Sequence, residues 1–414
     1  MASALERLDE ETVSELAVTV RNAGIAGAGG AGFPSYAKWE RVDEMNALLV
    51  NHQESEPNYF IDKWLGNTRA SDLAALFNAL TDSVLDLVVI GAKAVDRDEW
   101  MQEFEAATSP TAIYEPADLP VDPEETGIVF AYTEDKYEFG MENVLMHMIG
   151  DVVIGRELPM DFGWIVQNTE TVCAIYDALF EGQSMTHKYV HLDGDLLDHR
   201  FLEVPIGTPA SDLLTAGGLS ADALPGDVVL ADGGPGWCFE IEGSTDEFGV
   251  RKRTNCLLML DEATVWDNTL GGGRIDVRKN RGWARGNHEI DPTEGLLPEL
   301  VNIPLISNPA FMGIVTPSRP IVEPGDVVSE GEMIAVPAAK GISIPQHASI
   351  PGEVTKVTED HIRIQRTTSD SAVASVTPEV KGRLYWTWCM SCGEYVIPEA
   401  TVEDPRSYLC SDCQ

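Results

Sequence analysis

Residues 24–34 read Gly-Ile-Ala-Gly-Ala-Gly-Gly-Ala-Gly-Phe-Pro, and this loop decides how the first half of the 414-residue chain is interpreted. Gly27, Gly29 and Gly32 have the spacing of a dinucleotide-binding fingerprint, which normally follows a strand and opens a helix. Here the loop follows residues 8–21, whose apolar positions recur at helical spacing, and a proline comes two residues after the last glycine. We therefore reject the standard Rossmann fingerprint. Glycines still let backbone N–H groups approach a phosphate or a flat ring, and a simple turn is the alternative.

The sequence after this loop alternates between short apolar runs and amphipathic stretches. Such alternation predicts parallel strands joined by helices, which is a doubly wound α/β domain. From about residue 186, short strands separated by Gly, Pro and Asp turns predict a small α+β module. Residues 263–318 show no clear period and are interpreted as an irregular connector, whereas residues 319–370 predict a small β-sandwich. The expected strands are 47–50, 87–91, 111–114, 128–132, 189–192, 201–204 and 228–230, and the expected helices are 8–21, 71–81, 97–107, 140–149 and 211–216.

The charge balance is extreme, with 68 acidic and 28 basic residues and a net charge of −40. Acidic residues spread over a whole chain are typical of a high-salt cytoplasm, where salt screens self-repulsion, and a surface for a basic partner is the alternative. Nucleic-acid binding is disfavoured because neutralising phosphates requires patches of Lys and Arg. The sequence shows neither a secretory leader nor an apolar run of about 18 residues. We expect a cytoplasmic protein, and peripheral attachment to the inner face of a membrane is compatible with this expectation.

Four of the seven cysteines form two CxxC pairs near the end of the sequence, Cys389 with Cys392 and Cys410 with Cys413. This spacing predicts one tetrahedral thiolate site in a metal ribbon over residues 384–414. Zinc is the favoured metal, a rubredoxin-type iron site is the alternative, and a dithiol redox pair fits the matched spacing less well. The other three cysteines stand in apolar or mixed contexts and are expected to be small packed residues.

Four motifs together resemble one family of flavoproteins. The glycine loop continues through Ser-Tyr-Ala-Lys38, residues 51–57 read Asn-His-Gln-Glu-Ser-Glu-Pro, residues 140–145 read Gly-Met-Glu-Asn-Val-Leu, and residues 166–171 read Val-Gln-Asn-Thr-Glu-Thr. In this order the motifs resemble the flavoprotein subunit of bacterial respiratory complex I. They also resemble the RnfC component of the Rnf electron-transport complex and the cobalamin-reductase-like protein of propanediol microcompartments.

The resemblance extends beyond the flavin motifs and implies a domain organisation. Residues 204–209 and 231–237 are similar to the family's soluble-ligand-binding β-grasp (SLBB) module, and residues 321–328 and 347–354 are similar to its barrel-sandwich segment. The implied architecture is α/β overall. It comprises an FMN- and NADH-binding Rossmann-like domain (1–185), an SLBB β-grasp module (186–262), the connector (263–318), a barrel-sandwich hybrid (319–370) and the metal ribbon (384–414).

The resemblance also implies roles for individual residues. The main chain of four glycines would lie against the flavin and its phosphate, Lys38 would supply a cation, and hydride would pass from NADH to flavin N5. The remaining candidates are Asn51, Gln167 and Asn168 as hydrogen-bond partners of the flavin, Glu54 as a wall of the pocket, Phe33 as a stacking ring, Glu56 and Glu142 as acceptors from nicotinamide or ribose, and Gly27, Gly29, Gly30 and Gly32 as the loop glycines. Each role has a simpler alternative on the residues alone. The asparagines would only cap strand ends, the lysine and the glutamates would be solvated surface charges, and Phe33 would be a packing residue.

This chain also departs from the family. Rnf-type and cobalamin-reductase-type proteins carry two four-cysteine iron–sulfur motifs after the β-grasp module, whereas residues 263–318 contain no cysteine. Because such clusters need thiolate ligands, we expect no iron–sulfur cluster. The same segment holds an arginine-rich patch (Arg274 to Arg285), which predicts either a docking surface or a solvated loop. Two further departures concern the donor. His52 and Gln53 replace smaller or acidic residues of the family pattern, and only one of its paired helix-start glutamates is kept, as Glu142. These changes affect residues on which a preference for NADH would depend.

The expected function is therefore that of an FMN-dependent NADH dehydrogenase subunit. It would take hydride from NADH and pass electrons to a redox partner protein or a membrane electron-transport complex. Two alternatives remain open, a non-catalytic scaffold that keeps the fold and a flavin-to-rubredoxin-type reductase.

Overall fold

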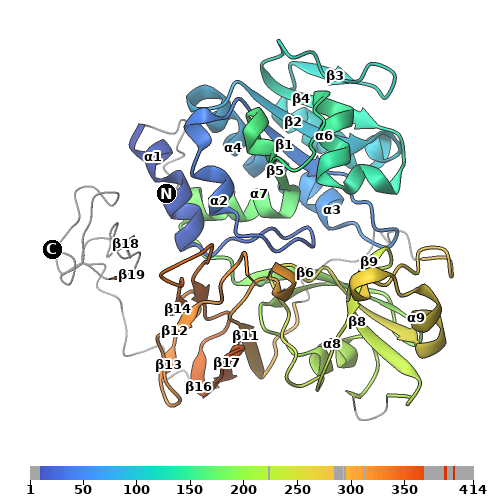
Figure 1. Ribbon diagram of the computed structural model, residues 1–414, viewed down its shortest axis with the longest axis vertical. Helices are drawn as coiled ribbons and strands as arrows, with labels where there is room; N and C mark the ends of the chain where they lie inside the picture. Colours follow the sequence, from blue (N-terminus) through green and yellow to red (C-terminus); the bar gives the residue numbers. More distant parts are fainter. Residues whose placement is uncertain are drawn as a thin grey trace.

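The first part of the chain builds a five-stranded sheet in which every strand pair is parallel, in the order β3-β4-β2-β1-β5 (Figure 1). The computed structural model describes residues 10–221, 224–283, 292, 295–311, 313–367, 387–388 and 395–396. The strands are β1 (Ala47–His52), β2 (Leu87–Lys93), β3 (Ala112–Tyr114), β4 (Gly127–Thr133) and β5 (Trp164–Asn168). The helices are α1 (Glu10–Asn22), α2 (Tyr36–Trp39), α3 (Ile61–Thr68), α4 (Ala70–Ser83), α5 (Gln102–Thr108), α6 (Glu142–Gly150) and α7 (Thr169–Tyr176).

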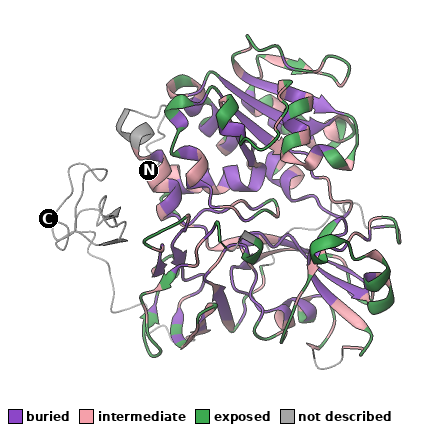
Figure 2. Ribbon diagram, in the orientation of Figure 1, coloured by how far each residue is buried: buried purple, intermediate pink, exposed green. Residues whose placement is uncertain are grey.

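Both faces of this sheet are covered, because alternate residues of each strand point to opposite sides. In β1, Leu48 and Val50 join one hydrophobic cluster with helices α1, α4, α5 and α7, while Leu49 joins a second cluster with α6. Figure 2 shows the resulting burial along the strands and on α7. The doubly wound α/β arrangement expected from the sequence is confirmed. The glycine-rich loop lies between α1 and α2 and follows no strand, which explains why the Rossmann fingerprint does not apply.

The second part forms a five-stranded mixed sheet in the order β7-β6-β10-β8-β9. The central β6–β10 pair is parallel and the other pairs are antiparallel, and α8 packs on one face through Leu213 and Leu214. The elements are β6 (His187–Gly194), β7 (Arg200–Pro205), α8 (Ala210–Ala216), β8 (Val228–Gly234), β9 (Trp237–Glu240), β10 (Cys256–Asp261) and α9 (Glu262–Asn268).

The third part consists of two small antiparallel sheets, β11-β17-β16-β13 and β12-β14-β15, around a core that includes Val301, Ile334 and Ile362. The strands are β11 (Leu300–Pro304), β12 (Arg319–Pro320), β13 (Val327–Val328), β14 (Met333–Val336), β15 (Gln346–His347), β16 (Gly352–Val357) and β17 (His361–Arg366). Near the end of the sequence β18 (Thr387–Trp388) pairs antiparallel with β19 (Tyr395–Val396). No helix among the described residues is long and apolar enough to cross a bilayer.

Residues 263–318 differ from the irregular connector expected from the sequence. Most of α9 falls there, and β11 pairs antiparallel with β17, so the β-sandwich takes a strand from this segment. Prolines at 298 and 304 frame β11 and read as loop signals in the sequence. The middle residue, Asn302, is polar yet fully buried, because its amide donates to the carbonyl of Asp246 and its side-chain oxygen accepts from Arg363. That buried amide hides the apolar pattern of the strand.

Candidate functional site

The carboxyl ends of β1 and β5 form the natural ligand edge of the parallel sheet. From β1 the chain moves to β2 on one side, and it later returns to place β5 on the other side. Such a topological switch point opens a crevice at the carboxyl ends of the strands, where open α/β sheets bind ligands. Asn51 and Asn168 are direct register partners at this edge. The fold therefore brings together two candidate residues that are 117 positions apart.

The glycine loop reaches this same edge and is fixed at its base. The Gly27 N–H donates to the carbonyl of Phe33 at 2.8 Å, and the Gly32 N–H donates to the carbonyl of Gly27 at 2.9 Å. The Ala28 N–H donates to the hydroxyl of Thr171 in α7 at 2.9 Å. A Cβ at position 29 would lie 3.0 Å from the amide nitrogen of Asn168, so the loop passes close to the end of β5 and a larger residue would press on that side chain.

The far side of the loop is held by the third part of the chain. Ser307 donates its hydroxyl to the carbonyl of Gly32, and the amide of Asn308 donates to the carbonyl of Ala31 at 2.8 Å. Between these anchors Gly30 has a φ of +96°, and a Cβ there would meet no atom within 4 Å. The loop is thus a clamped hairpin whose tip faces open space, as a cradle for a phosphate or a flat ring requires.

Lys38 connects the loop side of the crevice to the helix side. Its ammonium group donates to the carbonyl of Val166 at 2.8 Å and to the carboxylate of Glu142 at 2.9 Å. The Lys38 side chain is 18% exposed and that of Glu142 is 41% exposed, so both reach solvent at the edge of the sheet. The two candidate residues therefore meet, and an anion would compete with the Glu142 carboxylate for Lys38.

The three amide side chains have internal partners. Asn51 donates to the carbonyl of Gly140 at 2.9 Å, Gln167 donates to the hydroxyl of Ser35 at 2.7 Å, and the side-chain oxygen of Asn168 caps α7 by accepting from the Thr171 N–H. Gln167 is buried, whereas Asn51 and Asn168 are half-buried. The strand-end cap considered for Asn168 is present, and hydrogen bonds from these amides to a flavin stay a prediction. Phe33 is half-buried at the end of the loop, and its stacking role also stays a prediction.

A cavity of about 430 Å³ opens at the carboxyl ends of β1, β2 and β4. The candidates Glu54 and Glu56 both line it, whereas no residue of the glycine loop is among its lining residues. The cavity residues that the sequence analysis missed include Lys93 at the end of β2 and Asp135 just after β4, which form an ion pair of 2.9 Å. Their positions directly after predicted strands were the available signal. The lining residues are Glu54, Ser55, Glu56, Pro57, Tyr59, Phe60, Lys63, Lys93, Val95, Asp96, Glu99, Trp100, Asp135, Tyr137 and Arg278.

Glu54 is a buried carboxylate and Glu56 is a half-buried one. Glu54 has a left-handed backbone with a φ of 40°, and its carboxylate accepts the N–H of Asp62. Glu56 accepts the Gly236 N–H and the Tyr137 hydroxyl, each at 2.7 Å, so it ties the end of β1 to the turn between β8 and β9. Burial raises the pKa of each carboxyl to about 7, partly offset for Glu54 by Lys63 and for Glu56 by the Gly236 N–H.

Replacing Glu56 with glutamine is expected to stabilise the protein above neutral pH. The folded-state pKa of Glu56 is raised above its unfolded value, so its contribution to stability is present in acid and is lost as the pH rises from about 4.5 through 7. Glutamine mimics the protonated acid, because its oxygen can accept from Gly236 while its NH₂ faces the Tyr137 oxygen. In denaturant unfolding at fixed salt, the unfolding free energy of Glu56→Gln relative to wild type should increase by on the order of 2 kcal/mol from pH 5 to pH 8. Equal pH profiles for the two proteins, or the same gain in the exposed control Glu134→Gln, would contradict this.

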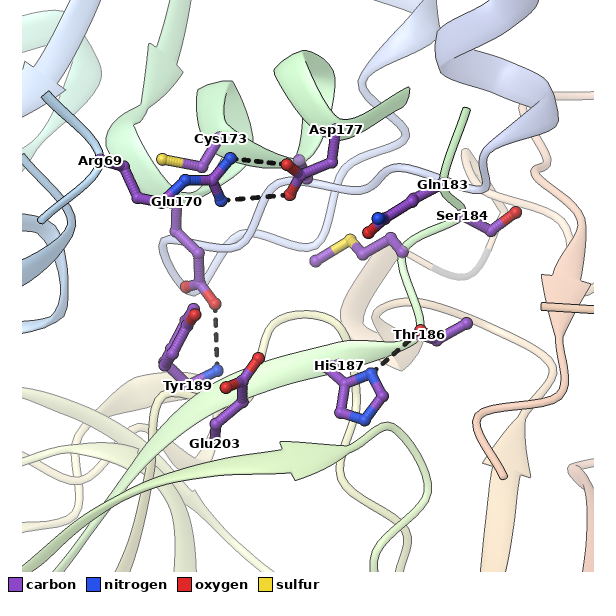
Figure 3. Close-up of a pocket in the computed structure, with 12 residues that line it drawn as sticks. Arg69, Glu170, Cys173, Asp177, Gln183, Ser184, Thr186, His187, Tyr189 and Glu203 are labelled. Carbon is purple, nitrogen blue, oxygen red and sulfur yellow. Dashed lines mark hydrogen bonds and ion pairs between the residues drawn. The ribbon is translucent and has the colours of Figure 1, made fainter. Parts of the chain in front are cut away.

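A second cavity, of about 230 Å³, lies between α7 and the strands β6 and β7 (Figure 3). Arg69 makes a bidentate ion pair with Asp177 on its wall. Glu170 accepts the Tyr189 N–H at 3.1 Å and is ion-paired with Lys188, whose side chain is fully buried. These charged groups are held by close partners, and Glu170 joins the first two parts of the chain through its contacts with β6.

The four cysteines of the predicted metal ribbon, Cys389, Cys392, Cys410 and Cys413, lie outside the described residues. The ribbon and its metal therefore stay predictions. The other three cysteines, Cys173, Cys238 and Cys256, are buried and unbridged, which confirms that they are packed residues.

Comparison with known proteins identifies two segments of the chain. Residues 20–177 match the family described as the Nuo51 FMN-binding domain, and residues 294–377 match the RnfC barrel sandwich hybrid domain. The chain is 30% identical to the RnfC-type component of the ion-translocating oxidoreductase complex of Pseudomonas aeruginosa over 246 residues, which is 58% of this chain and 29% of that protein. It is 30% identical to the cobalamin reductase PduS of Citrobacter freundii over 230 residues, which is 55% of this chain and 45% of that protein.

The chain thus spans less than half the length of these relatives. Among solved structures, it resembles a chain of an NAD⁺-reducing [NiFe]-hydrogenase in the air-oxidised state, with a TM-score of 0.49 and 20% identity over 63% of this chain and 48% of that one. The family resemblance drawn from the four motifs is confirmed by the two matched domains.

Proposed function

The chain carries the FMN-binding domain and the barrel sandwich domain of the flavoprotein family that includes RnfC and PduS, and from this premise we propose that it is an FMN-dependent electron-transfer subunit. One observation carries the proposal. The clamped glycine loop, Lys38 and the register pair Asn51–Asn168 meet at the switch point of the parallel sheet. Open α/β sheets bind their ligands at that point.

The residues present fit a flavin mononucleotide. The open space around Gly30 and the exposed main chain of the loop would receive the phosphate, with Lys38 supplying the positive charge. Asn51 and Asn168, which are register partners at the same edge, would hydrogen-bond the edge of the ring through their amide groups. When bound, FMN would supply the redox chemistry, accepting a hydride and releasing single electrons. The chain itself would orient the cofactor and exclude water.

The donor in this proposal is NADH, which would enter the cavity bordered by Glu54 and Glu56. We further propose the domain boundaries given by the sequence, with the mixed sheet as an SLBB β-grasp module and a zinc ribbon at residues 384–414. Electrons would leave to a redox partner protein or a membrane-bound complex, and the chain would work in a high-salt cytoplasm. The Pseudomonas aeruginosa relative, a component of an ion-translocating complex, favours a partner complex.

Purified protein is expected to take up one FMN per chain, and its flavin absorbance should bleach when NADH is added anaerobically in high salt. Riboflavin, which lacks the phosphate, should bind at least 10-fold more weakly, because it forgoes the charge-assisted contacts of the loop and Lys38. Failure to take up FMN would remove this function and leave the scaffold alternative. FMN uptake without bleaching would keep the flavoprotein and exclude NADH as its donor. Iron instead of zinc in the purified protein would favour the flavin-to-rubredoxin alternative.

A further inference from the structure

The 430 Å³ cavity is lined in part by a residue from the segment that follows the mixed sheet, which the flavin motifs do not include. Arg278 lines the cavity, and its guanidinium group lies 3.7 Å from the centroid of the Tyr137 ring. Asp276 holds it from the other side, accepting from Nε at 2.9 Å and from one terminal nitrogen at 2.8 Å. A guanidinium group has five N–H donors, so this geometry fixes the plane of the fork and leaves donors over for a ligand.

Asp276 serves two arginines at once. Arg274 also contacts its carboxylate, at 3.4 Å, while stacking over the ring of Trp237. Two guanidinium groups therefore share one carboxylate, and the Arg274–Asp276–Arg278 triad keeps a net positive charge. This charge matters in a protein whose net charge is −40, because most of its surface repels anions.

The two lysines of the same cavity have no such surplus. Lys63 pairs with Asp96 and Lys93 pairs with Asp135, each at 2.9 Å, so each lysine is balanced by its own carboxylate. Glu56 also lines the cavity and interacts with Arg278, but burial raises the pKa of its carboxyl to about 7, so part of its negative charge is lost at neutral pH. Among the described residues that line this cavity, Arg278 is thus the cation best placed to bind an added anion.

The rest of the lining suits a nucleotide. Phe60, Trp100 and Tyr137 all line the cavity, and the rings of Trp100 and Tyr137 are half-buried, so part of the wall is aromatic and suits a planar base. A volume of about 430 Å³ lies within the range of pockets that enclose small organic ligands. A planar guanidinium fork matches two oxygens of a phosphate better than the point charge of a lysine does.

We propose that Arg278 is the phosphate-binding residue of this cavity and holds the diphosphate of a dinucleotide donor. The inference rests on the proposed function and adds to it, because Arg278 lies outside both matched domains, residues 20–177 and 294–377. Asp276 and Tyr137 then act as positioning residues that keep the fork open towards the cavity.

The test uses ADP-ribose, a redox-inert ligand that carries a diphosphate, against adenosine, which carries none. Calorimetric titration of the full chain at one fixed salt concentration should show ADP-ribose binding about 10-fold more weakly to Arg278→Ala than to wild type, because charge-assisted hydrogen bonds are lost. Adenosine should bind both proteins equally. Arg278→Lys should fall between them. Arg274→Ala is the matched control, because Arg274 contacts the same Asp276 carboxylate but does not line the cavity. This variant should change the affinity for ADP-ribose by less than about 3-fold.

Several outcomes would overturn the assignment. They are an unchanged affinity of Arg278→Ala for ADP-ribose, equal losses in Arg278→Ala and Arg274→Ala, no binding of ADP-ribose to wild type, and displacement of ADP-ribose by an equal concentration of inorganic phosphate. The FMN content of each sample separates this result from the proposed function. A wild-type protein that takes up no FMN but binds ADP-ribose through Arg278 would refute the flavin function alone. Unaltered thermal unfolding of Arg278→Ala and Arg278→Lys would show that the variants are folded.

Discussion

Gly32→Ala is expected to weaken the binding of FMN strongly. Gly32 has a φ of +66°, and an added Cβ would lie 2.9 Å from the Cβ of Asn308 and 3.0 Å from the carbonyl oxygen of Ser307. The backbone strain and the clash together should cost about 3 kcal/mol, and the loop can escape only by breaking its contacts with Ser307 and Asn308. Absorbance titration with FMN should show an affinity loss of about 100-fold, accompanied by easier proteolysis within residues 27–33.

Gly30→Ala is the matched control for this variant. Gly30 also has a positive φ, +96°, but a Cβ there meets no atom within 4 Å. It carries the backbone strain without the clash, which should amount to about 1–2 kcal/mol. Equal losses of flavin in the two variants would mean that the contacts with Ser307 and Asn308 do not hold the loop in its binding shape.

Lys188→Met is expected to give the largest loss of stability. Lys188 is fully buried and pairs with Glu170, whose side chain is 6% exposed, so the substitution leaves a carboxylate without its counter-ion away from water. Breaking one partner of a buried pair costs about 3–5 kcal/mol. Burial already raises the pKa of Glu170, and Lys188 opposes that rise. Without Lys188 the pKa of Glu170 should rise further, so the loss of stability should grow as the pH increases above the unfolded value of 4.5.

The double variant Lys188→Met with Glu170→Gln separates the buried charge from lost packing. Glutamine keeps an oxygen to accept the Tyr189 N–H that Glu170 now accepts (Figure 3). Denaturant unfolding at constant salt should show that the double variant recovers most of the stability lost by the single one. If the double variant is as unstable as Lys188→Met, the effect comes from packing, and the buried-charge argument is wrong.

The sequence predicted the α/β part of the molecule well because its signals are local. The apolar run at residues 47–50 became β1, and the amphipathic stretch at 71–81 became α4. Motif order also located the edge of the sheet, since Asn51 and Asn168 end neighbouring strands. By contrast, β11 was missed because its middle residue is a buried amide whose partners lie far away in the sequence.

The sequence predicted individual residues of the candidate site that lie within a local motif, but it did not predict the contacts between motifs. Lys38 and Glu142 were both singled out, but their ion pair joins residues 104 positions apart and no pattern announces it. Arg278 appeared only as one member of an arginine-rich stretch. Its place over Tyr137 and beside Asp276 depends on how the segment after β10 folds back onto the first sheet, which is a long-range property.

The double clamp on the glycine loop sets an order for the maturation of the protein. The carbonyls of Ala31 and Gly32 accept hydrogen bonds from Asn308 and Ser307, which are 277 and 275 residues further along the chain and are therefore synthesised later. At about 5–20 residues per second a ribosome needs on the order of 15–55 s to make that distance, and the parallel sheet, made entirely of earlier residues, can form in the meantime. The cradle is therefore completed only after Ser307 and Asn308 have been synthesised. A nascent chain stalled before residue 307 would hold a folded sheet that cannot yet retain its cofactor.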